Sequence, residues 1–396
     1  MTVSVVVVSY QPGNWLAPCL SSVTGQADQV VVIDNGSPDA LATRLSRAAG
    51  ATVLRCPVNT GFAPAVNLGV AAAKGDIVAL LNDDAVAGPG WLAAAVTVLE
   101  DPSVAVVGPK VLLASRYREV VLDDPVWHAP GDARPLGRQV RSVTIAGTEM
   151  LGAAAGPGLH RLEGSAGDTW RWTAGAQPWY LPVPDGSDGE AVLIDGQEAP
   201  PGRLVRLLNS AGAFLDRRGY AGDIGADTAD EGLFDQPGER FAISGAAFVT
   251  RRDTWQRLGP FAGRYFAYYE DIDWCWRAHL AGLRVCYDPA AIVEHRRSAS
   301  SGGEHQPWVR VTAERNRTLT MVRNGPRGLV LKALRDRATN GPDGGVRAGI
   351  GRALPWALAS RARLSQKWAV PPQQVWGRWA GWAPAGEAAE DSLLRA

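Results

Sequence analysis

The sequence predicts an α/β fold with a mostly parallel sheet flanked by helices, a β-rich insertion and a helical C-terminal tail. In residues 1–110, short β-branched runs alternate with amphipathic stretches across short connections. This alternation favours a parallel sheet with right-handed crossovers. The run SVVVVS is continuously apolar, as expected for a strand that is covered on both faces. The alternation stops near residue 113 and resumes at residue 241.

The predicted strands and helices of the first part follow one another in order. Strands are expected at residues 4–9, 29–34, 51–56, 76–82 and 104–108. Helices are expected at residues 15–23, 41–49, 63–73 and 91–99. Parallel sheets bind ligands at the carboxyl ends of their strands. The polar segments SYQPGN, DNGSPD and NDDA all follow predicted strands, so we expect the ligand site among them.

The chain of 396 residues is expected to divide into four parts. Residues 1–112 and 241–325 form the two halves of the α/β domain. Residues 113–240 lose helical periodicity and gain Gly, Pro and Trp, which predicts a β-rich insertion. Residues 326–396 form a basic, Trp-rich tail.

The composition argues against several classes of protein. The 40 basic residues balance the 40 acidic residues, so no overall field favours nucleic acid. The four cysteines lack the spacing of a zinc site or a disulfide framework, which favours reduced thiols in the cytoplasm. The N-terminal apolar run lacks a basic leader and a cleavage site, and no apolar stretch approaches the roughly 18 residues that span a membrane. We therefore expect a soluble, cytoplasmic chain.

Two polar segments could hold a nucleotide. Asp34 ends the second predicted strand, where a carboxylate can accept hydrogen bonds from a ribose or a base, but DNGSPD is equally typical of a turn or helix cap. Residues 59–69, NTGFAPAVNLG, could approach phosphates at a helix N-terminus or could form an ordinary capping loop. The segment after the first strand contains no G-x-G-x-x-G, which argues against a dinucleotide but not against a mononucleotide.

Two acidic segments are candidates for chemistry. A buried strand runs directly into Asn82, Asp83 and Asp84, which suit a divalent cation shared with substrate phosphates, or form a solvated turn. The other segment, residues 270–273, opens a predicted helix with three acids between aromatic residues. The helix dipole accounts for one acid in the first turn, but not readily for three. His295 follows shortly after the next strand.

Six segments of the sequence resemble the family 2 glycosyltransferases, which have the Rossmann-like GT-A fold. Among these enzymes they are most similar to bacterial rhamnosyltransferase-like and galactofuranosyltransferase-like members. The resemblance covers roughly residues 1–112 and 241–325. The segments are SVVVVSYQPG, VVIDNGS, NTGFAPAVNLG, LLNDDA, ISGAAFVTRR and YFAYYEDIDWCWRAHLAGLRVCYDPAAIVEH.

The resemblance implies roles residue by residue. Asp271 is expected to be the general base. Asp84 and His295 are expected to bind Mg²⁺ or Mn²⁺, with Asn82 where many relatives have the first acid of the metal motif. The expected donor-binding residues are Ser9, Tyr10, Asp34, Asn59, Gly61, Asn67, Asn82 and Asp83. The expected acceptor-binding residues are Ser244, Gly245, Tyr269, Glu270 and Trp274. Tyr268 and Trp276 are expected to complete an aromatic wall, and Ala246 to lie with Ser244 and Gly245 beneath the acceptor.

The implied function is inverting, metal-dependent transfer of a sugar from a nucleotide-sugar donor to a hydroxyl of a glycan or lipid-linked cell-envelope acceptor. The donor expected first is dTDP-rhamnose, and UDP-sugars come next. A sugar-nucleotidyltransferase would need a Gly-rich and basic loop after the first strand, and SYQPGN is not such a loop. A non-catalytic carbohydrate-binding or scaffold protein is the other alternative, against which the acids and His295 argue.

The tail carries an excess of positive charge, unlike the chain as a whole. Between residues 326 and 380 it carries ten basic residues against Asp336 and Asp343, interspersed with Leu and Trp. Such segments lie in the headgroup region of anionic membranes, so we favour peripheral contact with the inner face of the cell membrane. The alternatives are helices packed on the catalytic domain and an oligomer contact, and Pro355 must kink or divide any helix there.

Overall fold

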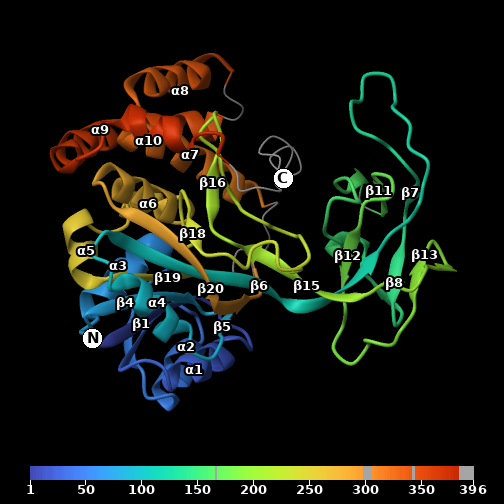
Figure 1. The fold of residues 1–396 in the computed structure, drawn as a ribbon, viewed down its shortest axis with the longest axis horizontal. Helices are drawn as coiled ribbons and strands as arrows, with labels where there is room; N and C mark the ends of the chain where they lie inside the picture. Colours follow the sequence, from blue (N-terminus) through green and yellow to red (C-terminus); the bar gives the residue numbers. More distant parts are fainter. Residues whose placement is uncertain (166, 298–305, 341–343, 383–396) are drawn as a thin grey trace. The chain divides into compact units, whose positions relative to one another are not determined.

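The computed structural model of the protein describes residues 1–165, 167–297, 306–340 and 344–382 (Figure 1). The described chain forms two compact units. The first unit comprises Met1–Leu112, Ser210–Ile224 and the chain from Leu233 onward. The second comprises Leu113–Asn209 and Gly225–Gly232. The second unit therefore begins where the insertion was expected, whereas much of the chain between residues 210 and 240 belongs to the first unit.

The first unit is built on a mixed sheet that confirms the α/β class. Its described strands run in the order β18-β20-β6-β19-β4-β1-β2-β3, and β5 pairs with β20. Strands β4, β1, β2 and β3 pair in parallel, whereas β19 pairs antiparallel with both β4 and β6. The bounds are β1 Val3–Ser9, β2 Gln29–Asp34, β3 Thr52–Arg55, β4 Ile77–Asn82, β5 Ala85–Ala87, β6 Val104–Val120, β18 Gly238–Glu239, β19 Ala247–Arg251 and β20 Arg284–His295. A small separate hairpin joins β16 Ala213–Leu215 to β17 Ala221–Asp223.

Helices flank this sheet (Figure 1). The bounds are α1 Leu16–Thr24, α2 Leu41–Ala48, α3 Phe62–Ala72, α4 Trp91–Leu99, α5 Arg252–Leu258, α6 Glu270–Leu280, α7 Pro307–Asn324, α8 Arg327–Asn340, α9 Gly344–Leu364 and α10 Pro372–Trp379. The core lies between α1, α4 and the central strands. Strand β1 is buried on both faces, since Val5, Val6 and Val7 are all inaccessible to solvent. Burying one such side chain contributes roughly 1.5 kcal/mol or more.

The second unit consists of short antiparallel strands around its own apolar cluster. Strand β6 continues into it from the first unit, and Trp179 of β12 is fully buried at the cluster. The remaining bounds are β7 Gln139–Val140, β8 Val143–Ile145, β9 Thr148–Glu149, β10 Glu163–Ser165, β11 Asp168–Trp172, β12 Trp179–Pro182, β13 Val192–Ile194, β14 Gln197–Glu198 and β15 Leu204–Ser210. Antiparallel pairing with tight turns explains why helical periodicity is absent from this part of the sequence.

The described part of the tail packs on the first unit. Helix α9 contacts α7, and Ala357 joins an apolar cluster with Tyr265 and Leu319. Helix α10 lies against α6, where Trp376 stacks on Trp276. Pro355 lies inside α9. Within the described residues, no helix combines the length and the apolar character that a membrane crossing requires. Asp343 and residues 383–396 lie outside the described residues.

Candidate active site

Strand pairing brings two distant candidate metal ligands together. The apolar strand β4 ends at Asn82, and the next two residues lead into β5. Strand β20 pairs antiparallel with β5, with His295 opposite Ala85. The register is extended by a hydrogen bond from the backbone N–H of Arg296 to the carbonyl of Asp84 (3.0 Å). As a result, His295 Nε2 lies 3.1 Å from Asp84 Oδ1 and 3.2 Å from Asn82 Nδ2.

The side chains at this point fit a divalent cation. A carboxylate oxygen and an imidazole nitrogen converge, and both are ligands that Mn²⁺ accepts. Asn82 Oδ1 is buried and has no hydrogen-bond partner among the residues the structure describes. The described residues contain no group of three or more His, Cys, Asp or Glu side chains able to hold a metal. A cation such as Mg²⁺ commonly takes one or two protein carboxylates and completes its shell with water and substrate phosphates.

Asp83 lies between these residues in an environment unfavourable to charge. Burial raises the pKa of Asp83 to about 7 and the charge of Asp84 adds to the effect, while the nearby polar groups of Ser9 and Tyr10 oppose it. Ser9 is fully buried at the end of β1, and Tyr10 is partly exposed. Three expected donor-binding residues thus lie together at the carboxyl ends of β1 and β4, which are neighbours in the sheet.

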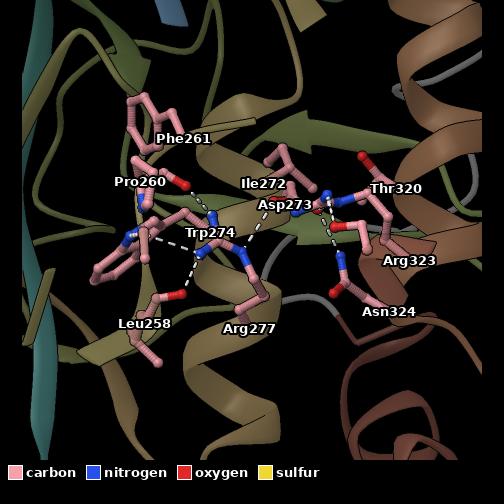
Figure 2. Close-up of polar contacts among 12 residues, drawn as sticks. Leu258, Pro260, Phe261, Ile272, Asp273, Trp274, Arg277, Thr320, Arg323 and Asn324 are labelled. Atoms are coloured by element: carbon pink, nitrogen blue, oxygen red, sulfur yellow. Dashed lines mark hydrogen bonds and ion pairs between the residues drawn. The ribbon is translucent and has the colours of Figure 1, made fainter. Parts of the chain in front are cut away.

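The three acids of α6 have different environments, although they share one helical turn. Asp273 is fully buried and accepts hydrogen bonds from Arg277, Arg323 and Asn324, at 2.7 to 3.0 Å (Figure 2). Burial raises its pKa, but Arg323 and Arg277 outweigh burial and the pKa is lowered. Arg277 also donates to the carbonyls of Leu258, Gly259 and Pro260. Asp273 therefore fixes α6 to its neighbours, and both of its carboxylate oxygens are engaged in these contacts.

Glu270 and Asp271 form a pair with the opposite electrostatics. Burial raises the pKa of Asp271, although backbone N–H groups of Gly245 and Ile272 donate to its two oxygens at 2.8 and 2.7 Å and oppose the rise. Burial, followed by the charge of Asp271, holds the pKa of Glu270 well above its usual range. The Oε2 atom of Glu270 is buried without a hydrogen-bond partner within the described part of the chain. Raised pKa values in adjacent carboxyl groups are typical of acid–base sites.

One tripeptide connects the candidate base to the candidate metal loop. The backbone N–H of Gly245 donates to Asp271 Oδ2, and the carbonyl of the next residue, Ala246, accepts from the N–H of Asn82 (2.9 Å). Ser244 Oγ accepts from the N–H of Ala246 (3.3 Å). A Cβ atom at position 245 would lie 3.3 Å from the Phe62 ring and 3.5 Å from Asp271 Oδ2, so the glycine keeps this contact close. Residues 244–246 therefore hydrogen-bond the candidate base through Gly245 and the candidate metal loop through Ala246.

The loop at residues 59–61 is held by a residue that the sequence did not single out. Asn35 Nδ2 donates to Asn59 Oδ1 (3.1 Å) and to the carbonyl of Gly61 (3.2 Å). Asn35 Oδ1 accepts from the backbone N–H and the hydroxyl of Thr60. The only signal was its place directly after Asp34 in DNGSPD, which is also a turn sequence. Asn35 thus joins the ends of β2 and β3, strands that pair in parallel.

Two residues expected to bind the donor make internal contacts instead. Asp34 is fully buried, and its oxygens accept from the backbone of Ser37 and the hydroxyl of Thr43, as the turn interpretation requires. The amide of Asn67 exchanges two hydrogen bonds of 3.0 Å with the backbone of Phe261. These contacts shape the loops around the candidate donor side.

Gly61 is required by the close approach of another loop. Its φ is +90°, and a Cβ atom there would lie 2.5 Å from Phe266. The loop that precedes α6 therefore packs directly on the start of α3.

The prediction that Trp274 lines an aromatic wall on the acceptor side is wrong. This side chain has no exposed surface, stacks on Trp255 at 5.7 Å between ring centroids, and donates from Nε1 to the carbonyl of Gly259. Trp276 is buried as well. Helical periodicity explains both, because each faces a core on its own side of α6. Tyr269 is partly buried at the N-terminus of α6, and its hydroxyl accepts from the N–H of Ala221 (3.3 Å).

Comparisons with known proteins identify similar sequences and a similar fold. Residues 4–124 match the family model described as Glycosyl transferase family 2. The chain is 24% identical over 303 residues to N-acetylglucosaminyl-diphospho-decaprenol L-rhamnosyltransferase of Mycobacterium tuberculosis, covering 75% of this chain and 77% of that protein. The crystal structure of GalNAc-T7 with UDP, GalNAc and Mn²⁺ superposes with a TM-score of 0.51 at 13% identity. That alignment covers 94% of this chain and 58% of GalNAc-T7, less than two thirds of its length, and shows the fold alone.

The fold is that of the GT-A glycosyltransferases, and residues 4–124 are similar to glycosyltransferase family 2. Over three quarters of its length the chain is also similar to a mycobacterial rhamnosyltransferase. Both statements agree with the resemblance seen in the six sequence segments.

Proposed function

We propose that the protein is an inverting glycosyltransferase that moves a sugar from a nucleotide-sugar donor to a hydroxyl of a lipid-linked glycan of the cell envelope. The mycobacterial relative is named for rhamnosyl transfer to N-acetylglucosaminyl-diphospho-decaprenol, so dTDP-rhamnose is the first donor to test. UDP-sugars come next, because GalNAc-T7 was crystallised with UDP. The proposed place in metabolism is the building of cell-wall polysaccharide on a lipid carrier.

The proposed cofactor is Mg²⁺ or Mn²⁺, held by Asp84 and His295. The convergence of Asp84 Oδ1 and His295 Nε2 at 3.1 Å supports this assignment, and GalNAc-T7 contains Mn²⁺. When bound, the cation would offset the charge that develops on the diphosphate leaving group.

The proposed base is Asp271. The acceptor oxygen attacks the anomeric carbon, the bond from that carbon to the diphosphate oxygen breaks, and the hydroxyl proton passes to the Asp271 carboxylate. One direct displacement inverts the anomeric configuration. Two properties support Asp271 in this role: burial strengthens it as a base, and the Gly245 N–H fixes its orientation at 2.8 Å. Glu270 is proposed to bind the acceptor.

The observation that carries the proposal is the double contact of residues 244–246. A segment that hydrogen-bonds both Asp271 and Asn82 sets the acceptor-activating group beside the metal loop, as a direct displacement needs. A scaffold protein would not need a buried and a partly buried carboxyl group, both with raised pKa values, at the segment that contacts that loop.

The test is direct turnover by the full chain. The purified protein is incubated with dTDP-rhamnose, UDP-glucose, UDP-galactofuranose or UDP-N-acetylglucosamine, and with N-acetylglucosaminyl diphosphate carrying a short prenyl chain. We expect acceptor-dependent release of nucleoside diphosphate with Mn²⁺ or Mg²⁺, its loss with chelator, and an inverted linkage in the product. Binding of donor without turnover by any pair would favour the carbohydrate-binding alternative. Release of diphosphate from a nucleoside triphosphate and a sugar phosphate would favour a nucleotidyltransferase.

Peripheral contact with an anionic membrane remains part of the proposal, now restricted to α8. On this helix Leu331 is 70% exposed, and Arg327, Lys332 and Arg335 are exposed near it. Positions 327, 331 and 335 recur every four residues and so share one face of the helix. An exposed leucine among cations is suited to the headgroup region of a membrane that carries a lipid-linked acceptor.

A further inference from the structure

The loop that leads into α6 has a strained backbone. Phe266 has φ 68° and ψ −67°, and the N–H of Ala267 donates to the carbonyl of Tyr265 (2.9 Å), which together define a classic γ-turn. Tyr268 and Tyr269 follow with φ of 70° and 71°. Side-chain-bearing residues rarely adopt positive φ, because the side chain then crowds the backbone. Such strain persists only where the surroundings impose it, and it clusters at functional sites.

The surroundings impose the strain from two sides. Asn316 of α7 is fully buried, and its Nδ2 lies 2.8 to 3.0 Å from the carbonyl oxygens of Tyr265, Ala267 and Tyr268. From the start of α3, the N–H of Ala63 donates to the carbonyl of Phe266 (3.1 Å). The loop is therefore held in a defined conformation before any ligand arrives.

The loop presents aromatic rings that remain accessible. Phe266 is 38% exposed and Trp308, at the start of α7, is 41% exposed. Their ring centroids lie 6.5 Å apart, nearly perpendicular, and the Tyr268 ring lies 5.9 Å from that of Trp308. We name these three residues, Phe266, Tyr268 and Trp308, the aromatic surface. Large accessible aromatic rings grouped on a rigid loop are a common feature of binding sites.

A polar group two residues after Tyr268 in the chain lacks a partner. Glu270 opens α6, and its Oε2 is buried with no hydrogen-bond partner in the described ranges. A buried acceptor atom without a donor is costly, and a ligand hydroxyl would relieve that cost. A sugar ring offers both an apolar C–H face for stacking and hydroxyl donors.

We propose that the aromatic surface and Glu270 form a subsite for a pyranose ring of the acceptor, with Trp308 as its stacking platform. The proposal rests on the proposed function, since it assigns the acceptor side of that reaction. Asn316 is the positioning residue, because it holds the strained loop that carries two of the three rings. The prenyl chain of a lipid-linked acceptor is the alternative occupant that the test must separate.

The first experiment measures steady-state kinetics of Trp308→Ala and Trp308→Phe. We expect Trp308→Ala to raise the acceptor KM about tenfold or more, as loss of a stacking tryptophan does, while the donor KM stays within about twofold. Trp308→Phe should recover most of the affinity because a flat ring remains. The matched control is Trp127→Ala, a 48% exposed tryptophan of the second unit that also has one edge-on aromatic neighbour. An unchanged acceptor KM in Trp308→Ala would overturn the subsite.

A second experiment does not depend on turnover. Saturation-transfer NMR of the wild-type chain with methyl N-acetylglucosaminide, methyl rhamnoside and farnesyl diphosphate reports direct binding of sugar or prenyl probes. A methyl glycoside signal that disappears in Trp308→Ala and persists in Trp127→Ala supports the subsite. This holds even if no sugar is transferred and the proposed function fails. Absence of glycoside signal in the wild type, or a Trp308-dependent signal on farnesyl diphosphate alone, would overturn it.

Discussion

At the scale of single residues, the first turn of α6 assigns opposite electrostatic roles to neighbouring acids. Asp273 faces two guanidinium groups and is held ionised, whereas Glu270 and Asp271 lie in buried surroundings that favour their protonated forms. For Asp271 the difference from Asp273 arises from helical geometry, because residues 271 and 273 point to different sides of the helix. For Glu270, burial and the charge of Asp271 raise the pKa. The same type of side chain therefore stabilises the fold at position 273 and is the proposed base at position 271.

Replacing Asp273 should cost stability. Asp273→Asn leaves Arg277 and Arg323 buried without an anion, and breaking a buried ion pair costs about 3–5 kcal/mol. The pKa of Asp273 is lower in the folded state than in the unfolded state. Its contribution to the free energy of unfolding is therefore fully present above the unfolded-state pKa and is lost as the pH falls through the folded-state pKa. Urea unfolding at neutral and acidic pH checks both points. Equal midpoints for the variant and the wild type at neutral pH would contradict this role.

The activity should depend on pH through the base. Because the pKa of Asp271 is raised by burial, a proton must be lost above the ordinary aspartate range before the carboxylate can accept one from the acceptor. We expect kcat/KM to rise with pH through an apparent pKa above 3.8, shared with Glu270. Since the charge of Asp271 raises the pKa of Glu270, Asp271 ionises first and Glu270 is neutral while it does so. The profile of Glu270→Gln should therefore keep this limb near its wild-type position, and a clear move of the limb to lower pH would show that Glu270 is charged while Asp271 titrates.

At the scale of elements, the site depends on pairings that local sequence does not encode. The apolar run of β4 ending in NDDA predicts a ligand loop by itself, and that loop is found at a strand end. His295 reaches Asn82 across 213 residues only through the pairing of β20 with β5, which resemblance suggested but periodicity could not. Trp274 was misassigned because aromatic neighbours indicate a pocket wall and a packed core equally well.

The pairing of β20 with β5 places His295 beside Asp84, so both residues should contribute to metal-dependent donor binding. Asp84→Ala should weaken donor binding in Mn²⁺ by about tenfold or more, and His295→Ala should weaken it less, because carboxylates dominate Mg²⁺ and Mn²⁺ sites. Calorimetric titration of nucleotide-sugar into the full chain, with Mn²⁺ and then with chelator, measures this. Asp253→Ala, an exposed acid in the first turn of α5, is the control. Equal wild-type affinity in both solutions would refute a metal-dependent donor site.

Helix α8 makes a prediction about membranes. Leu331→Asp combined with Lys332→Glu should abolish binding to vesicles containing anionic phospholipid, because each basic residue near such a surface contributes about 1 kcal/mol. Co-sedimentation at low and high salt measures it. Leu68→Asp, an exposed leucine on α3, is the control. Wild-type binding that is absent, or indifferent to anionic lipid, would leave α8 as surface packing.

At the scale of the whole molecule, the catalytic unit is assembled from segments at both ends of the chain. The tail was expected to be a separate part, but α7 and α9 pack together and Arg323 of α7 joins Asp273 of α6 to Ser360 of α9. Cutting the chain after Asn324 would remove α9 from this cluster and expose apolar residues. Surface substitutions therefore test the tail better than truncation does. No local sequence pattern predicted that the tail packs on α6 and α7, because buried arginines cannot be told from exposed ones in the sequence.

The most direct test of the account is Asp271→Asn, compared with the wild type in transfer and in donor binding on the same preparations. The substitution preserves shape and removes proton acceptance, so we predict that transfer falls by roughly 100-fold or more while the donor Kd stays within about twofold. Asp253→Asn should match the wild type in both measurements. Transfer by Asp271→Asn within a few-fold of the wild type, with unchanged donor binding, would contradict the assignment of Asp271 as the base.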